Sequence, residues 1–569
     1  MVGLPRPLRW RPRRAPAPGW RARAETSGWE LDPTDHRLLG LLDEIARPAS
    51  EVLVVTDRRH ERLARLVPSG QVLETAAVSP HLLRIRLAIG PRPDLIVLDT
   101  EDPARRRRLV TWLAFLVPRG GSLVVARVRE AATADHSTLR YVAGLLDHEP
   151  GEQPPPGVRA ADIPHLRAGW REVRLAGNHL VLSNDLRTYI PLLERETNQA
   201  LARRPRLGRV LATVPGGDFG HRGELRESES RVAGRWPAAY DVPELSLREY
   251  ADVVCRPGGI VISGHTLLPD THRHIARPRP SNRFVPTLSP TAARLRSRIE
   301  PEREIPGPHF YWDSEFRGHF GHVMTEMLSR LWALDAARRH HRDLRILMAT
   351  SPNKESELTD HEIAILGAFG VRPAEITFLR GPARVRTLLA ATPMFSQPQV
   401  VHPGLSEVWD RLGSHLAEQA PARFGEGDYP RRLFVARRGT LRRCRNAAQV
   451  ESLFATHGFE VVHPEDHPLP VQARLFREAE TIAGYAGSGL FNALLAETPK
   501  RIVMISSESY TVQNEWMIAA IRGHEVDVAW ARPEVGHEAA GTRAEAFHSA
   551  YSVDFEREGL FLRKVLADL

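Results

Sequence analysis

Residues 317–332, RGHFGHVMTEMLSRLW, predict a helix whose two faces differ in chemistry. One face has the i, i+3, i+4, i+7 spacing of apolar residues that pack on a core. The opposite face carries the side chains that could do chemistry: His319, His322, Glu326 and Arg330. An exposed face with an i,i+4 ion pair would give this pattern. Two histidines in the first turn, with Gly318 and Gly321 beside them, would equally suit a ligand that approaches the helix closely.

A run of arginines lies where a predicted strand at 432–437 gives way to a predicted helix at 446–458. Its members are Arg437, Arg438, Arg442, Arg443 and Arg445. The planar guanidinium group matches the oxygens of a phosphate, and a helix N-terminus adds backbone N–H donors. A generic basic loop is the competing interpretation in a chain so rich in arginine. The position after a strand favours a phosphate site.

A glycine turn follows another predicted strand, in the segment GYAGSGLFN (484–492). Gly487, Ser488 and Gly489 form the turn, and Asn492 lies on the first turn of the helix that follows. Glycines at such a position let backbone amides converge on an anion. A tight structural turn would explain the same residues.

The last third of the chain alternates short apolar runs with helical patterns. Strands are expected at 432–437 and 501–506, and at EVV, TIAGYAG and EVDVAW, with helices between them. This alternation predicts a doubly wound parallel sheet, and such sheets bind ligands at the carboxyl ends of their strands. The arginine run and the glycine turn are therefore expected at one edge. Residues 241–428 predict another α/β region, which begins with a hairpin at 255–270.

Residues 31–190 predict a further α/β domain. Strands such as EVLVVTD and DLIVLDT alternate with helices, and Gly177-Asn178 predicts a hairpin. The pattern resembles the class I methyltransferase fold, whose members place a glycine-rich turn after the first strand. Here that turn reads TDRRHERL, and its side chains would block the close approach of S-adenosylmethionine. We therefore expect a Rossmann-like, methyltransferase-like domain that does not bind this cofactor.

Two flanking segments lack the periodicity of a folded domain. Residues 1–30 form an Arg- and Pro-rich leader, with seven arginines and no acid in the first 24 positions, and disorder is expected there. Residues 191–240 are rich in Arg, Pro and Gly and are expected to be a linker.

The composition narrows the class of protein. The 569 residues predict two to four domains, and no run approaches the ~20 apolar residues that span a bilayer. Two cysteines exclude a disulfide scaffold. The net charge is +9, but acids are interspersed with the bases, so a nucleic-acid partner is not expected. A cytoplasmic protein is expected, with weak peripheral contact to acidic lipid at the inner membrane face left open.

Four blocks together resemble glycosyltransferase family 61, in order and in approximate spacing. They are GHVMTEMLSRLW (321–332), RRGTLRRCRN (437–446), the helix of Gln472, and GSGLFN (487–492). The resemblance runs from about residue 240 to the end. Many members have a histidine in a Gly-His-Gly-Ala-Gly turn, where this chain has Ala486. The role of that histidine is missing here or supplied elsewhere.

The resemblance implies an α/β fold with a GT-B-like pair of Rossmann-like lobes, an acceptor lobe at 241–428 and a donor lobe at 429–569. It implies transfer of a sugar from a nucleotide-diphosphate sugar to a glycan, lipid-linked or small-molecule acceptor in polysaccharide biosynthesis, with inversion and without a metal or other cofactor. The implied donor-binding residues are Arg437, Arg438, Arg443, Asn446, Gln472, Gly487, Ser488, Gly489 and Asn492.

For catalysis, inversion needs a general base, and we expect His322 to be that base, oriented by Glu326. Glu326 acting directly is the second choice. His319 and Arg330 are expected to support the acceptor. A catalytically inactive binding or scaffold protein, and a bifunctional methyltransferase–glycosyltransferase, are the alternatives.

Overall fold

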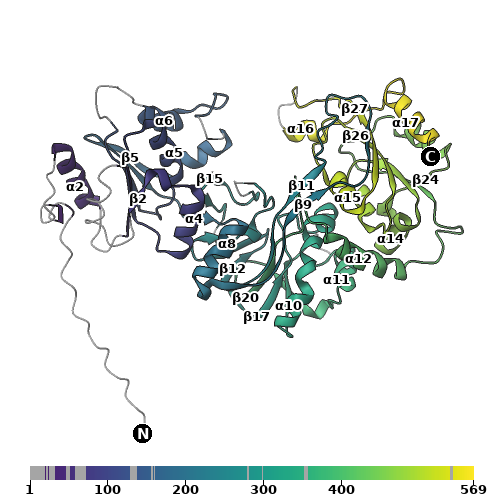
Figure 1. Ribbon diagram of the computed structural model, residues 1–569, viewed down its shortest axis with the longest axis horizontal. Helices are drawn as coiled ribbons and strands as arrows, with labels where there is room; N and C mark the ends of the chain where they lie inside the picture. Colours follow the sequence, from purple (N-terminus) through teal and green to yellow (C-terminus); the bar gives the residue numbers. More distant parts are fainter. Residues whose placement is uncertain are drawn as a thin grey trace, which may run out of the picture. The chain divides into compact units, whose positions relative to one another are not determined.

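The computed structural model describes residues 20, 23–24, 32–45, 51–57, 72–128, 137–155, 158, 160–277, 281–297, 299–351, 357–538 and 543–569. The chain forms two compact units (Figure 1). Unit 1 comprises residues 1–192 and 285–296, and unit 2 comprises residues 193–284 and 297–569. Both units combine helices with sheets, so the predicted α/β class is confirmed. Apart from Trp20, Arg23 and Ala24, the predicted leader lies outside the described residues.

Unit 1 contains a six-stranded sheet in the order β2-β1-β3-β4-β6-β5. Its strands are β1 Val52–Thr56, β2 Val72–Glu74, β3 Leu95–Asp99, β4 Ser122–Val125, β5 Trp170–Ala176 and β6 His179–Asn184. The strands β1 to β4 are parallel, whereas β6 is antiparallel to β4 and forms a hairpin with β5 at Gly177-Asn178. Successive residues of β1 enter two different apolar clusters. Both faces of the sheet are therefore buried, which explains the unbroken apolar run in its sequence.

The helical elements of unit 1 connect these strands. They are α2 Pro33–Ile45, η1 Thr75–Ala77, α4 Pro80–Ile89, α5 Pro103–Leu113, α6 Ser137–Asp147, η2 Ala160–Asp162 and α7 Ile163–Arg167. Pro residues at the start of α4 and α5 suit a first helical turn, where no backbone N–H is needed.

A short segment from much later in the chain completes unit 1. The strands β15 Thr287–Ser289 and β16 Ala292–Arg294 pair with each other, and β16 pairs antiparallel with β7 Thr188–Pro191. Leu288 and Ala292 are buried in one of the two apolar clusters. The predicted boundaries, which assign 241–428 to one lobe, miss this insertion.

The prediction of a linker over 191–240 is wrong. This segment forms α8 Glu194–Arg203, η3 Pro205–Leu207, β8 Gly208–Val214, β9 Gly217–Gly220, β10 Leu225–Glu227 and β11 Ala239–Val242. The strands are short and largely exposed on one side, so their sequence shows little periodicity. Two of them pair with strands that are distant in sequence, β8 with β12 and β10 with β27.

Unit 2 contains two main sheets, and we call the elements around each sheet a lobe. The sheet of the first lobe is mixed, with the order β14-β13-β12-β20-β17-β18-β19, and β8 also pairs with β12. Its strands are β12 Leu245–Arg256, β13 Ile260–Ser263, β14 Thr266–Leu267, β17 Arg303–Tyr311, β18 Arg345–Ala349, β19 Ile376–Leu379 and β20 Ala383–Ala391. The pairs among β17 to β20 are parallel, whereas β12 is antiparallel to β20. The lobe also contains η4 Pro269–Thr271, α11 Asp360–Ala368, η7 Pro373–Glu375, the pair β21 Phe395–Ser396 and β22 Val400–Val401, and α12 Leu405–Gln419.

The second lobe of unit 2 is an all-parallel sheet in the order β10-β27-β26-β25-β23-β24 (Figure 1). Its later strands are β23 Arg432–Val435, β24 Glu460–Val462, β25 Thr481–Tyr485, β26 Arg501–Ser507 and β27 Glu525–Ala531. Its helical elements are α13 Ala447–Ala455, η8 Pro464–Asp466, α14 Leu469–Glu478, η9 Leu490–Leu495, α15 Asn514–Arg522, α16 Arg543–His548 and α17 Glu558–Ala567. The strand order reverses between β23 and β25, so this edge is the topological switch point of the sheet.

The helix predicted at 317–332 is not a regular α-helix. It consists of α9 Phe320–His322, a π-helical turn at Val323–Met327, a 3-10 segment η6 Leu328–Ala333 and then α10 Leu334–His340. The apolar stripe is buried as expected, but Glu326 and Arg330 are only 9% and 7% exposed. An exposed polar face is therefore excluded for these two residues. No helix in the described part of the chain is long and apolar enough to cross a membrane.

Candidate active site

A cavity of about 770 Å³ lies at the switch point of the second-lobe sheet. Val435 and Tyr485, the last residues of β23 and β25, form part of its floor. Phe320 from α9 and His361 from α11 contribute the first-lobe side of the wall. The cavity is therefore built by both lobes of unit 2, at the edge where a doubly wound sheet binds ligands.

Arg437 lies directly against the glycine turn. Its Nη1 donates a hydrogen bond to the carbonyl oxygen of Ala486 at 3.2 Å, and it lines the cavity. Gly487 has a φ of +143°, and a Cβ there would lie 3.3 Å from the same Nη1. The turn thus needs glycine both for its backbone conformation and for the approach of the guanidinium group.

Arg442 is the second cation at this turn. Its guanidinium carbon lies 4.9 Å from the ring centres of both Tyr510 and Phe547, and its buried Nε has no hydrogen-bond partner among the described residues. Burial and the charge of Arg442 lower the pKa of Arg437. In the described part of the chain neither arginine forms an ion pair with a carboxylate. Two close cations favour the binding of an anion, although the carboxylate of Glu465, which also lines the cavity, acts to raise the pKa of Arg437.

His322, at the end of α9, and Glu326, on the π-helical turn, form the predicted pair. The distance between His322 Nδ1 and Glu326 Oε1 is 3.2 Å, and Arg273 Nε donates to the same oxygen at 2.8 Å. Burial opposes ionisation of Glu326, but the hydrogen bond and charge of His322 and the charge of Arg273 outweigh it and lower the pKa of Glu326 to about 2. With Nδ1 bonded to the carboxylate, Nε2 of His322 is the nitrogen with an available lone pair.

The start of α9 is packed on the glycine turn. A Cβ at Gly321 would lie 3.1 Å from the ring of Phe491 and 3.2 Å from Cβ of Ser488. The glycine beside His322 therefore permits close contact between the two lobes, which differs from the predicted role of admitting a ligand. This contact places α9, which carries His322, beside the glycine turn; Phe320 of α9 lines the cavity, whereas His322 does not.

Residues 320–503 match the family described as Glycosyltransferase 61. This segment of the chain is therefore similar to glycosyltransferase family 61. The matched segment contains α9, the π-helical turn, the arginine run and the glycine turn, and it ends in β26. A comparison with curated proteins found no match.

Three of the predicted donor-binding residues of this glycosyltransferase do not line the cavity. Arg438 is exposed and forms an ion pair with Asp466, and its backbone N–H donates to Glu465. Arg443 is exposed, and Asn446 holds the C-terminal segment by two hydrogen bonds to the backbone of Val553, at 2.9 and 3.0 Å. Asn446 stands at the N-cap position of α13 but makes no side-chain cap hydrogen bond there.

Gln472 and Asn492 line the cavity. Nδ2 of Asn492 donates to Oε1 of Gln472 at 2.8 Å, and Nε2 of Gln472 donates to the carbonyl oxygen of His467 at 2.8 Å. These bonds connect the end of the glycine turn to the loop before α14. Both side chains thus fix the wall of the cavity.

The amide of Gly487 is turned away from the cavity. It donates to Oε1 of the buried Glu515 at 2.7 Å, and the hydroxyl of Tyr510 donates to the same oxygen at 3.1 Å. Burial raises the pKa of Glu515 to about 7, although its own and the Gly487 backbone N–H, Tyr510 and Arg442 oppose the shift. The amides of Ser488 and Gly489 have no acceptor in the described part of the chain, so they are the donors left for an anion.

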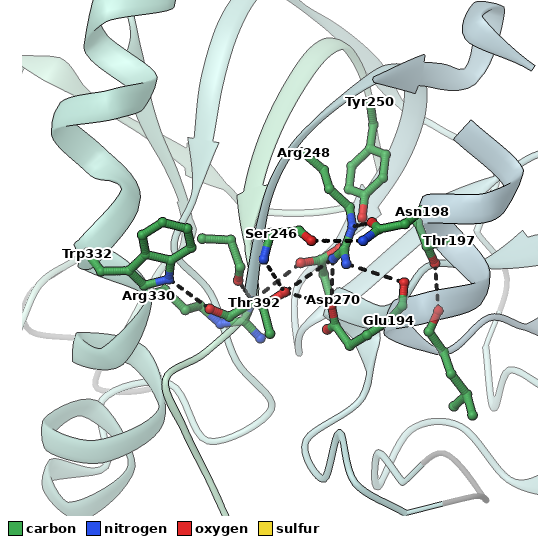
Figure 2. Close-up of polar contacts among 12 residues, drawn as sticks. Glu194, Thr197, Asn198, Ser246, Arg248, Tyr250, Asp270, Arg330, Trp332 and Thr392 are labelled. Carbon is green, nitrogen blue, oxygen red and sulfur yellow. Dashed lines mark hydrogen bonds and ion pairs between the residues drawn. The ribbon is translucent and has the colours of Figure 1, made fainter. Parts of the chain in front are cut away.

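Arg330 lies in a buried network instead of at an acceptor site (Figure 2). Its Nη1 donates to Asp270 Oδ1 at 3.3 Å and to the carbonyl oxygen of Ala391 at 2.7 Å. The hydroxyl of Tyr250 donates to the other oxygen of Asp270 at 2.9 Å, and the fully buried Arg248 lies beside it. The network ties η6 to strands β12 and β20, so Arg330 acts on the site through the position of the helix.

His319 is exposed beside the pair, with its ring centre 4.9 Å from that of His322. Desolvation and the charges of His322, Arg273 and Arg442 lower the pKa of His319. The sequence analysis assigned no role to Arg273, Glu515, Tyr510 or His361. None belongs to the four blocks, and only proximity in the fold connects them to the site.

Proposed function

We propose that this glycosyltransferase moves a sugar from a nucleoside diphosphate sugar to a hydroxyl group of a glycan, lipid-linked or small-molecule acceptor, in glycan or polysaccharide biosynthesis. The observation that carries the donor class is Arg437, which lines the cavity, together with Arg442, which lies beside it at the glycine turn. A diphosphate would relieve the repulsion between these cations and accept charge-assisted hydrogen bonds from them. The cavity volume lies within the ~300–1,000 Å³ of small-molecule sites.

In this proposal the two lobes of unit 2 are the GT-B-like pair. Their shared cavity supports that assignment, although only the second lobe has an all-parallel sheet. The parallel strands and edge hairpin of unit 1 support a methyltransferase-like domain. The turn TDRRHERL lies largely outside the described residues, so loss of S-adenosylmethionine binding stays a prediction. A cytoplasmic location and weak contact with a membrane surface stay predictions as well.

The proposed reaction is a single displacement with inversion. The acceptor oxygen bonds to the anomeric carbon, the bond from that carbon to the diphosphate breaks with its electron pair, and the hydroxyl proton goes to Nε2 of His322. Glu326 is too weak a base for this step with a pKa of about 2, so it holds Nδ1 of the imidazole. Arg437 and Arg442 offset the charge that develops on the diphosphate, so the proposal requires no metal ion.

Donor binding is tested by calorimetry with uridine, guanosine and cytidine diphosphates. We expect one of them to bind, and Arg437→Ala and Arg442→Ala to weaken it at least tenfold, because a hydrogen bond to a charged group contributes ~1.5–3 kcal/mol. The matched control is Arg445→Ala, which removes an exposed arginine of the same loop that pairs with Glu534. Equal affinities of the Arg437→Ala and Arg445→Ala proteins would contradict the proposal.

The base is tested by turnover of the nucleotide sugar that binds. His322→Ala should lower kcat by about 10²–10⁴, the usual contribution of general acid–base catalysis, and leave donor affinity unchanged. Glu326→Gln should lower kcat less. If the native protein binds a diphosphate but neither transfers nor hydrolyses any nucleotide sugar, the catalytically inactive binding protein is the correct description.

A further inference from the structure

A closed ring of contacts is formed by four side chains: those of Arg273, Glu326, His322 and Phe316. Arg273 Nε donates to Glu326 at 2.8 Å, and Glu326 lies 3.2 Å from His322 Nδ1. The ring of Phe316 stacks on that of His322, with centres 4.3 Å apart and planes 13° from parallel. The guanidinium carbon of Arg273 lies 4.9 Å from the centre of the Phe316 ring. Each member of this group, the imidazole clamp, therefore touches two others.

Arg273 is itself held in place by its backbone. Its N–H donates to the carbonyl oxygen of Ser281 at 3.0 Å, and its carbonyl oxygen accepts a hydrogen bond from Ser396 Oγ at 2.8 Å. The two partners come from different segments of the first lobe. Because these two bonds fix the backbone of Arg273, its planar guanidinium group can be held against one carboxylate oxygen of Glu326.

We propose that Arg273 and Phe316 are positioning residues that hold the imidazole of His322 in a single orientation, with Nδ1 toward Glu326 and Nε2 toward the acceptor. Glu326 alone would fix one nitrogen but would leave the ring free to turn about that bond. Stacking on Phe316 fixes the plane of the ring, and Arg273 fixes both Glu326 and Phe316. Arg273 and Phe316 lie outside the matched residues 320–503. This inference rests on the proposed role of His322 as base.

The charges around His322 predict a change in the pH profile of kcat/KM that a loss of packing alone would not cause. His319, Glu326 and Arg273 face the imidazole, and Arg283 and Glu315 are close to Phe316 and Arg273. Loss of the Arg273 charge favours the protonated imidazole, which cannot act as a base. The acid limb of the profile of kcat/KM against pH should therefore move to higher pH.

The test compares Arg273→Gln, Arg273→Lys and Phe316→Leu in the full chain. Arg273→Gln should lower kcat about tenfold, leave the KM for the donor unchanged and move the acid limb to higher pH. Arg273→Lys should leave the acid limb in place and lower kcat, because it keeps the charge and loses the fork. Phe316→Leu should also lower kcat without moving the limb, and Phe316→Tyr should restore kcat.

The matched control is Arg411→Gln. Arg411 stacks on Phe369 at 4.6 Å and pairs with Asp335 at 2.7 Å, so it loses the same two kinds of contact away from the cavity. It should change neither kcat nor the acid limb. If His322→Ala lowers turnover but Arg273→Gln leaves the acid limb in place, the inference is wrong and the base assignment stands. If His322→Ala has no effect, the base assignment and this inference fail together, whereas the donor class is judged separately by diphosphate binding.

Discussion

At the scale of the residue, Glu515 is the group whose ionisation should be visible in the stability of the protein. Its pKa is raised from an ordinary 4.5 to about 7 in the folded state, chiefly by burial. Its contribution to stability is therefore fully present below about pH 4.5 and is lost as the pH rises through about 7. A shift of this size corresponds to about 3 kcal/mol.

The prediction is that Glu515→Gln flattens this part of the pH dependence. Glutamine keeps an oxygen that accepts the amide hydrogen bond of Gly487 but cannot ionise. The melting temperature of the native protein should fall more than that of Glu515→Gln between pH 5 and 8, measured by calorimetry in matched buffers. Parallel curves for the two proteins would show that the carboxyl group does not titrate in this range.

Single residues also show how much of the candidate site could be predicted from the sequence. Arg437 could be predicted because it directly follows a strand whose carboxyl end faces the cavity. Which of Arg442 and Arg443 lies at the glycine turn could not be predicted, because they are adjacent residues of the same type. Their directions depend on the positive φ of 54° at Arg442, which no periodicity reveals. Glu515 and Arg273 reach the site through distant segments of the chain.

At the scale of the element, the contact between α9 and the glycine turn joins the two halves of the site. Gly321 is the residue that allows it, since any side chain there meets Phe491 and Ser488. We predict that Gly321→Val separates the elements and lowers kcat more than tenfold, at a cost in stability of about 1–3 kcal/mol. Gly367→Val in α11 is the control, because a Cβ there meets nothing within 4 Å.

The readouts for this pair of variants are turnover and thermal unfolding. The Gly321→Val protein should still bind the diphosphate, because Arg437 and Arg442 belong to the second lobe. If Gly321→Val and Gly367→Val have equal kcat, the packing of α9 does not position the base.

Elements with strong periodicity were predicted well. The strands of the last third and the hairpin at Gly177-Asn178 occur as expected. The π-helical turn was not predicted, because an inserted residue leaves the i, i+4 pattern of side chains almost intact. The strands between 208 and 242 were missed because they are short and stabilised by partners far away in sequence.

At the scale of the whole molecule, the units do not follow the order of the chain. Residues 285–296 belong to unit 1, although the residues on both sides belong to unit 2. The predicted boundaries divide the chain into consecutive pieces and miss this excursion, although residues 277–298 are richer in Arg and Pro than the chain as a whole. The number of α/β regions could therefore be predicted, whereas the path of the chain through them could not.

The strand β10 determines which fragments of the chain can keep the second-lobe sheet complete. It forms the edge of the second-lobe sheet beside β27, and its Arg226 bonds to Asp527 at 2.7 Å. A fragment of residues 429–569 would lack β10. The strand β27 would then be an unpaired edge, and Asp527 would lose its bond to Arg226. A piece of the chain that keeps this sheet whole is therefore expected to include Leu225–Glu227.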